Sequence, residues 1–181
     1  MSEAKAQKIA TRPAVKLEPM AELLLVRELE KFVNYESELL DDREFETWCA
    51  LYTEDAIYWA PSRVDQTDPL NELSLIYDDR EIRDMRIRRL RHPRVHAQIP
   101  YSRTTHLVGN FVVEDIDQGG KEIAFRCRFA VHEYRPEWDV RTFAGQFEYR
   151  VARDGASFRI KYKKATIINC DAMHYPISIP F

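Results

Sequence analysis

Glycine is scarce in this sequence, with five residues among 181. None of them belongs to a glycine-rich loop that follows a strand, so the sequence contains no phosphate-binding loop for a nucleotide. Long apolar runs are also missing, since the longest one near the start is residues 23–26. A run of this length is too short for a membrane span or for the core of a signal peptide, and we expect a cytoplasmic protein.

An excess of basic residues is absent as well. The 27 Lys and Arg against 30 Asp and Glu give a formal net charge of −3. Proteins that bind nucleic acid or a membrane surface usually carry a clear basic excess, so we expect neither partner. The length suits one well-buried core and is small for two domains. We expect a flexible N-terminal arm over residues 1–18, which lack apolar periodicity, and a single domain over residues 19–181.

The iron-ligand motifs Cys-x-His and Cys-x-x-His are absent as well, and we expect no metal held by this chain alone. The three cysteines are odd in number and widely spaced, which indicates free thiols rather than disulfides. Ser102 and Ser157 lack the context of a nucleophile elbow. The histidines are His92, His96, His106, His132 and His174.

Residues 105–168 contain four apolar-rich segments that are separated by turn residues. In each segment every second residue is apolar, which is the period of a half-buried strand. Gly119-Gly120 and Asp154-Gly155 lie between segments and suit hairpin turns. This pattern predicts an antiparallel meander with one aromatic face. The inward positions are Ile123, Phe125, Cys127, Phe129 and Val131, then Phe143, Gly145, Phe147, Tyr149 and Val151, then Phe158, Ile160 and Tyr162.

Helical periodicity precedes this meander. Residues 23–40 have the apolar spacing of one long amphipathic helix. Asp41 and Asp42 are expected to cap a second helix, whose buried stripe would include Trp48 and Tyr52. Residues 56–60 predict a short strand that ends at Pro61, and a third, arginine-rich helix is expected over residues 79–91. Helices followed by a long meander predict an α+β sheet that curls into a cone.

The remaining residues for acid–base chemistry are Tyr52, Asp55, Tyr58 and His106. They could converge inside the cone, where a His oriented by Asp would abstract a proton and the phenols would polarise a carbonyl. This would make the chain a stand-alone dehydratase or isomerase. The alternative is structural, because a single strand histidine is often a hydrogen-bonded structural residue and Asp after a helix often forms a turn. The sequence leaves both interpretations open.

Several motifs occur in a recognisable order. One lies in residues 39–61, another in residues 83–90 and another in residues 160–171. The most specific is Pro100-x-Ser102-Arg103-Thr104-x-His106 with Asn110 following it. In this order they resemble the small β subunits of aromatic-ring-hydroxylating dioxygenases, over roughly residues 22–181.

The resemblance implies a cone-shaped α+β fold like those of nuclear transport factor 2 and scytalone dehydratase, with a curved, mostly antiparallel sheet against N-terminal helices. It implies a non-catalytic subunit that forms a trimeric base within an α₃β₃ hexamer. The large α subunit would hold a Rieske 2Fe–2S cluster and a mononuclear Fe(II). Electrons from NADH would arrive through separate reductase components, and O2 would be added across an aromatic ring to give a cis-dihydrodiol.

The arginine content of the third helix suits bidentate pairing with carboxylates at a protein interface. We expect Arg86, Arg88, Arg89 and Arg103 at subunit interfaces, with at least one of the first three paired to an acidic residue of a neighbour. Residues 68–77 resemble the subgroup that acts on benzoate-like acids. The chain departs from the family pattern at Thr105, where arginine is frequent.

Overall fold

The computed structural model describes residues 17–94 and 98–181. The arm predicted over residues 1–18 therefore lies almost wholly outside the described residues, as does His96. The division into an arm and one domain stays a prediction.

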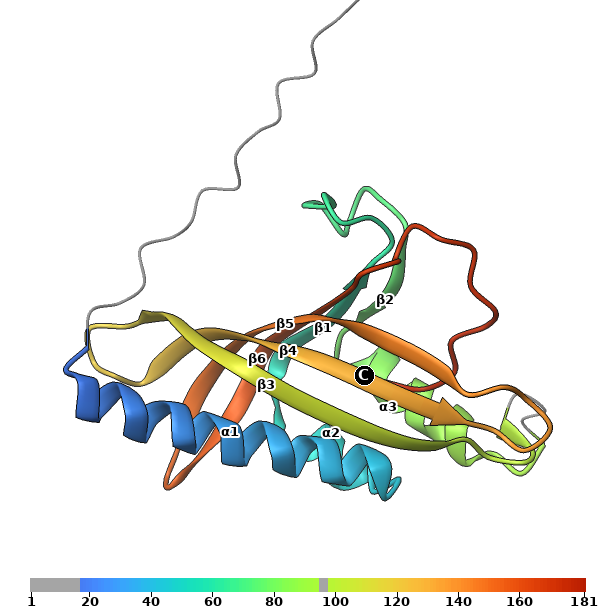
Figure 1. Cartoon of the computed structure of the whole chain (residues 1–181), viewed down its shortest axis with the longest axis horizontal. Helices are drawn as coiled ribbons and strands as arrows, with labels where there is room; N and C mark the ends of the chain where they lie inside the picture. Colours follow the sequence, from blue (N-terminus) through green and yellow to red (C-terminus); the bar gives the residue numbers. More distant parts are fainter. Residues whose placement is uncertain (1–16, 95–97) are drawn as a thin grey trace, which may run out of the picture.

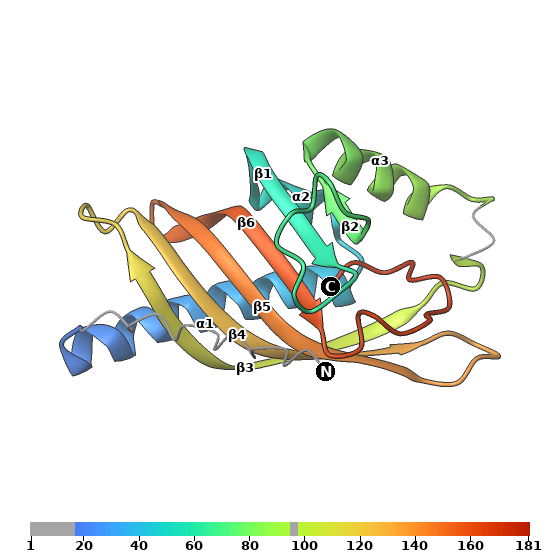
Figure 2. The same cartoon turned by 90° about the horizontal axis from the view of Figure 1, so that it is seen from above.

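The centre of the fold is a curved sheet of six strands in the order β2-β1-β6-β5-β4-β3. The four strands β3 to β6 form the predicted antiparallel meander, and β1 joins it by parallel pairing with β6. Figures 1 and 2 show how strongly the strands twist across the sheet. The strands are β1 (Tyr52–Pro61), β2 (Ser74–Asp78), β3 (Arg103–Ile116), β4 (Glu122–Tyr134), β5 (Arg141–Asp154) and β6 (Ser157–Ile167).

Three helices cover the sheet: α1 (Pro19–Asp41), α2 (Phe45–Ala50) and α3 (Arg80–Arg91). The longest, α1, runs across one face, while α2 and α3 lie near β1 and β2 (Figures 1 and 2). Leu29, Phe32 and Val33 of α1 are at most 4% exposed. They pack on the predicted aromatic face, where the Phe32 ring meets that of Phe158 edge to face at 5.6 Å. No helix in the described ranges has both the length and the apolarity to cross a bilayer.

The helix boundaries near Asp41 differ from the prediction. Asp41 is the last residue of α1, and α2 begins after Glu44 without a side-chain cap. The Asp41 carboxylate instead accepts hydrogen bonds from β3, so it is not available to the amides of α2. Tyr52 belongs to β1 rather than to the helix, and β1 is longer than the predicted residues 56–60. The strand β2 was not predicted from the sequence.

The third helix is confirmed. Asp79 caps α3, since its Oδ1 accepts from the backbone amide of Ile82 at 2.9 Å. Its inward face carries Arg83, Ile87 and Leu90. Two of the predicted free thiols, Cys127 and Cys170, are buried, and Cys49 is partly exposed.

Residues 168–181 loop back onto the sheet (Figures 1 and 2), and Phe181 is fully buried. Its ring lies 5.2 Å from that of Phe143 and 6.1 Å from that of Phe129. The interior of the cone is therefore plugged by the protein's own side chains.

Candidate functional site

A carboxylate lies in the core between α1 and the sheet. Glu36 is on the buried face of α1, and its side chain is 1% exposed. Its Oε1 accepts from Lys163 Nζ at 2.7 Å and from Trp48 Nε1 at 3.0 Å. Its Oε2 accepts from the Tyr149 hydroxyl at 2.7 Å. These donors offset the cost of removing the charge from water.

Lys163 connects this carboxylate to Phe181, the residue that plugs the cone. Its Nζ also donates to the carbonyl oxygen of Phe181 at 2.6 Å and lies 4.4 Å from the centre of the Phe147 ring. The backbone amide of Phe181 in turn donates to the Tyr58 hydroxyl at 2.8 Å. Burial lowers the pKa of Lys163, and the adjacent Glu36 opposes that shift. The Glu36–Lys163 ion pair thus connects α1 to β6 and also fixes the backbone of Phe181.

This arrangement uses two of the predicted acid–base residues for structure. Tyr52 and Tyr58 are at most 3% exposed. Burial raises the pKa of both hydroxyls above the ordinary tyrosine value, so both phenols are neutral near pH 7. The Tyr58 hydroxyl is occupied by Phe181, and the Tyr52 hydroxyl faces Glu36 at 3.4 Å. Neither phenol is placed to polarise a substrate carbonyl.

His106 has a different carboxylate partner from the predicted one. Its Nδ1 lies 2.6 Å from Oδ1 of Asp41, and its backbone amide donates to Oδ2 at 2.9 Å. The imidazole is 1% exposed, and Nε2 is buried without a partner. Burial alone raises the pKa of Asp41, but the hydrogen bonds from His106 and Thr104 outweigh it and the pKa lies below the ordinary value. Nε2 is therefore not open to a substrate in this structure.

Asp55 does not join this group. It is exposed on β1, and its Oδ1 accepts from the Thr53 hydroxyl at 2.8 Å. The prediction that Tyr52, Asp55, Tyr58 and His106 converge is therefore wrong. Alternation along β1 places Tyr52 and Tyr58 in the core and turns Asp55 to solvent, while His106 pairs with the end of α1.

The arginines of α3 fall into two groups. Arg86 makes a bidentate pair with the buried Asp78 within the chain, with distances of 2.5 and 2.8 Å. Arg88 and Arg89 are exposed and make no ion pair with another described residue. Arg103 is exposed at the start of β3, 4.9 Å from the centre of the Tyr134 ring. Arg86 thus already has an acidic partner, and the other three remain predicted interface residues.

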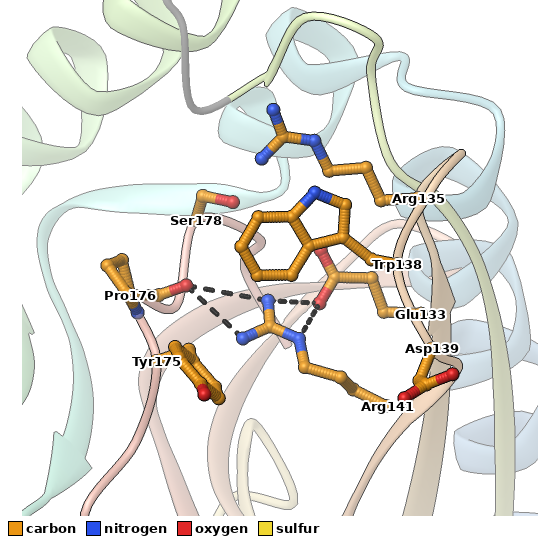
Figure 3. A pocket seen from close by; sticks show the side chains of 8 residues that line it. All are labelled: Glu133, Arg135, Trp138, Asp139, Arg141, Tyr175, Pro176 and Ser178. Carbon is orange, nitrogen blue, oxygen red and sulfur yellow. Dashed lines mark hydrogen bonds and ion pairs between the residues drawn. The ribbon is translucent and has the colours of Figure 1, made fainter.

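A pocket of about 150 Å³ lies between the β4–β5 hairpin and the segment that follows β6. Figure 3 shows the Arg141 guanidinium at its centre, with dashed lines to Glu133 and to the carbonyl of Pro176. Trp138 and Tyr175 flank it and are 51% and 71% exposed. Since Arg141 is paired with Glu133 at 2.6 Å, the pocket presents exposed rings more than free charge.

Metal-ligating side chains do not gather in the part of the chain that the structure describes. Over residues 17–94 and 98–181, no three His, Cys, Asp or Glu side chains form a group that could hold a metal ion. The residues present do not fit an iron centre within these ranges.

Sequence reasoning missed Glu36 and Lys163 as partners. The signal for Glu36 was its place in the apolar stripe of α1, where a carboxylate needs a buried cation or donors. The signal for Lys163 was hidden, because strand alternation assigned Tyr162 to the interior in its place.

Comparisons with known proteins agree on one family. The family model described as "Ring hydroxylating beta subunit" matches residues 35–172. The 2-halobenzoate 1,2-dioxygenase small subunit of Burkholderia cepacia is 32% identical over 153 residues, which are 82% of this chain and 90% of that protein. The solved β subunit of benzoate 1,2-dioxygenase from Burkholderia mallei superposes with a TM-score of 0.66 at 27% identity, covering 88% of this chain and 97% of that one.

A protein from Novosphingobium aromaticivorans described as a scytalone dehydratase has a TM-score of 0.60 at 18% identity, covering 81% of this chain and 86% of that one. At this identity the likeness concerns the fold alone. Together with the β subunit match, it confirms the predicted cone-shaped α+β fold class.

Proposed function

Because this chain belongs to the family of ring-hydroxylating dioxygenase β subunits, we propose that it is the non-catalytic, structural subunit of such an oxygenase. The chemistry belongs to a large α subunit, which holds a Rieske 2Fe–2S cluster and a mononuclear Fe(II). Electrons come from NADH through separate reductase components. The complex acts in the cytoplasm in the catabolism of aromatic compounds and forms a cis-dihydrodiol.

The plugged interior is the observation that supports this proposal most. The volume where a cone-shaped enzyme could bind a substrate is filled by Phe181 and by the Glu36–Lys163 pair. Their polar atoms already bond to other residues of the chain, so the interior contributes rigidity rather than a reactive group. A rigid subunit with satisfied buried groups is suited to holding a larger partner in place.

For the substrate, we propose a benzoate-like aromatic acid. Two relatives are named for 2-halobenzoate and benzoate, and residues 68–77 resemble that subgroup. The substrate would bind in the α subunit, so this chain would affect its choice only indirectly.

For the assembly, we propose an α₃β₃ hexamer in which Arg88, Arg89 and Arg103 contribute to subunit interfaces. Arg88 and Arg89 present guanidinium groups that pair with no described residue of the chain, and arginine binds carboxylates in a planar, bidentate geometry. Arg86 fixes α3, the helix that carries Arg88 and Arg89, to β2 through its ion pair with Asp78.

Co-expression with a large subunit that carries the Rieske motifs Cys-x-His and Cys-x-x-His tests the proposal. We expect sedimentation at the mass of a hexamer, with the red-brown Rieske absorption in the same fraction. The chain expressed alone should bind no iron. A chain that remains monomeric beside a folded large subunit would contradict the proposed function.

The same assay tests the arginine surface. Arg88→Ala, Arg89→Ala and Arg103→Ala are compared with Arg27→Ala, an exposed arginine of α1 that pairs only with the nearby Glu30. An arginine that becomes desolvated at an interface costs about 2–5 kcal/mol of association energy when truncated. Unchanged assembly in all three variants would refute this assignment.

A further inference from the structure

Among the described residues, one buried charge has no counterion. The buried charged residues are Glu36, Asp78, Arg83, Glu133 and Lys163. Four of them are in ion pairs, Glu36 with Lys163, Asp78 with Arg86 and Glu133 with Arg141. Arg83 is 2% exposed and lies within 4.0 Å of no carboxylate among the described residues. Buried arginines are almost always paired, so this exception calls for a ligand.

The contacts of Arg83 within the chain are weak. Its guanidinium carbon lies 4.2 Å from the centre of the Tyr52 ring, and its Nη1 donates to the carbonyl of Ala56 at 3.4 Å. Its Nε is buried and has no hydrogen-bond partner. The nearby Cys49 thiol is not the missing anion, because burial raises the pKa of Cys49 to about 11 and Arg83 only partly opposes this. Near pH 7 the thiol is therefore neutral.

Arg83 lies at the wall of a cleft of about 230 Å³ between α2, the start of α3, β1 and β6. Arg80 and Arg159 line the same cleft. Arg80 pairs with Glu54, and Arg159 Nη2 donates to the carbonyl of Tyr52 at 2.7 Å while its Nε stays buried without a partner. The carboxylates in the lining are Glu54 and Asp84. Arg80 pairs with Glu54 and Arg159 Nη1 lies 3.9 Å from Oδ2 of Asp154, so Arg83 is the arginine of this cleft that has no ion-pair partner among the described residues.

We propose that this cleft is a carboxylate-binding site, with Arg83 and Arg159 as the residues that hold the anion. The Arg83 guanidinium has no ion-pair partner, the Arg159 guanidinium pairs with Asp154 only at 3.9 Å, and guanidinium groups supply the planar donor geometry that a carboxylate accepts. The carboxylate comes either from a free small acid or from an acidic side chain of a neighbouring subunit. The second source rests on the proposed function, whereas the first does not.

Thermal unfolding of the full chain in sodium acetate tests the first source, with sodium chloride at equal ionic strength as the reference. Binding to the folded state raises Tm with ligand concentration. We expect a saturable rise with acetate that exceeds the effect of chloride. Arg83→Met and Arg159→Gln should increase the half-effective acetate concentration at least tenfold. Because the Arg159 side chain is partly exposed, Arg159→Gln tests the site even if Arg83→Met does not fold.

Arg89→Gln is the matched control, since Arg89 lies on the same helix and does not line the cleft. It should change the half-effective concentration by less than twofold. An equal loss in Arg89→Gln would show a general charge effect and would overturn the site.

Assembly with the large subunit tests the second source. If acetate has no specific effect, Arg83→Met and Arg159→Gln should weaken assembly at least tenfold, while Arg27→Gln, at an exposed arginine of α1, should change it by less than twofold. If neither acetate binding nor assembly depends on Arg83 and Arg159, the site is refuted. If the wild-type chain does not assemble, the proposed function fails, and the acetate experiment alone decides the site.

Discussion

At the scale of single residues, Asp41 joins the end of α1 to β3. Its carboxylate receives hydrogen bonds from the Thr104 hydroxyl at 2.7 Å and from the backbone amide of His106 at 2.9 Å, and it contacts the His106 ring. Its side chain is 23% exposed, so these bonds are only partly screened by water. Asp41 therefore fixes the longest helix to the edge strand of the sheet.

Asp41→Asn should destabilise the fold in a pH-dependent way. Hydrogen bonds to a charged group contribute about 1.5–3 kcal/mol, and the asparagine keeps the shape without the charge. The pKa of Asp41 in the folded state lies below its ordinary value of 3.8. As the pH falls, the unfolded chain binds the proton before the folded chain does. The greater stability of the wild type is therefore complete above the ordinary pKa of 3.8, and it is lost as the pH falls through the lower pKa of the folded state.

Urea unfolding at several values between pH 7 and pH 3 measures this difference. Asp42→Asn is the matched control, because Asp42 is adjacent and exposed, and surface changes of this kind stay within about 0.5 kcal/mol. A wild-type advantage over Asp41→Asn that is the same at pH 3 and at pH 7 would contradict the role of the Asp41 charge.

The partner of His106 shows why residue-level predictions failed here. The hypothesis from the sequence was that Asp55 could orient His106 if their elements met inside the cone. The pairing depends on where α1 ends against β3, and Asp41 and His106 are separated by 65 positions in the chain. Residue type predicted that His106 needs a carboxylate, but only the packing of α1 determines which one.

At the scale of elements, strand alternation predicted the inward residues of β4 and β5 correctly. It failed in the middle of β6, where Tyr162 was expected inside. The pairing register with β5 shifts between Ile160 and Tyr162, so Lys161 is an extra residue in a β-bulge. The bulge changes the alternation, so that Lys163 faces the core and Tyr162 is only partly buried. A bulge has no reliable sequence signature, which is why the buried ion pair was not predicted.

The β5–β6 pairing also depends on Gly145. A Cβ added at this position would lie 2.0 Å from the carbonyl oxygen of Thr166 and 2.9 Å from Cα of Ile167. Both atoms belong to the backbone of β6 and cannot yield without moving the strand. Gly145→Ala should therefore destabilise the fold by about 1–3 kcal/mol, as overpacking does.

Gly109→Ala in β3 is the matched control, since a Cβ there meets nothing within 4 Å. At a compatible position this change stabilises by about 0.4–1 kcal/mol through the unfolded state. Guanidinium unfolding of both variants should give effects of opposite sign. Equal effects would show that the close approach of β6 does not restrict position 145.

At the scale of the whole molecule, ordered motifs predicted the family and the fold class, because the sequence preserves the order of helices, turns and strands. The motifs did not show whether the cone is open. That depends on residues 168–181, which lie outside the helices and strands. The buried end of that segment is fixed by Tyr58 and Lys163, which are 123 and 18 positions away in the chain. Contacts of this range come from the closed fold and not from local pattern.

Phe181→Ala tests whether the plug holds the molecule together. Removing a fully buried phenylalanine ring from between Phe129 and Phe143 leaves an apolar cavity, which should cost about 3–5 kcal/mol. Tyr175→Ala, at a 71% exposed ring of the same segment, should change stability by no more than about 0.5 kcal/mol. Urea unfolding compares the two. Because a dry apolar cavity of this kind binds benzene, benzene should restore part of the stability of Phe181→Ala and leave Tyr175→Ala unchanged. A loss of stability without any response to benzene would mean that the sheet collapses around the missing ring, and that the cone is closed by its own curvature rather than by Phe181.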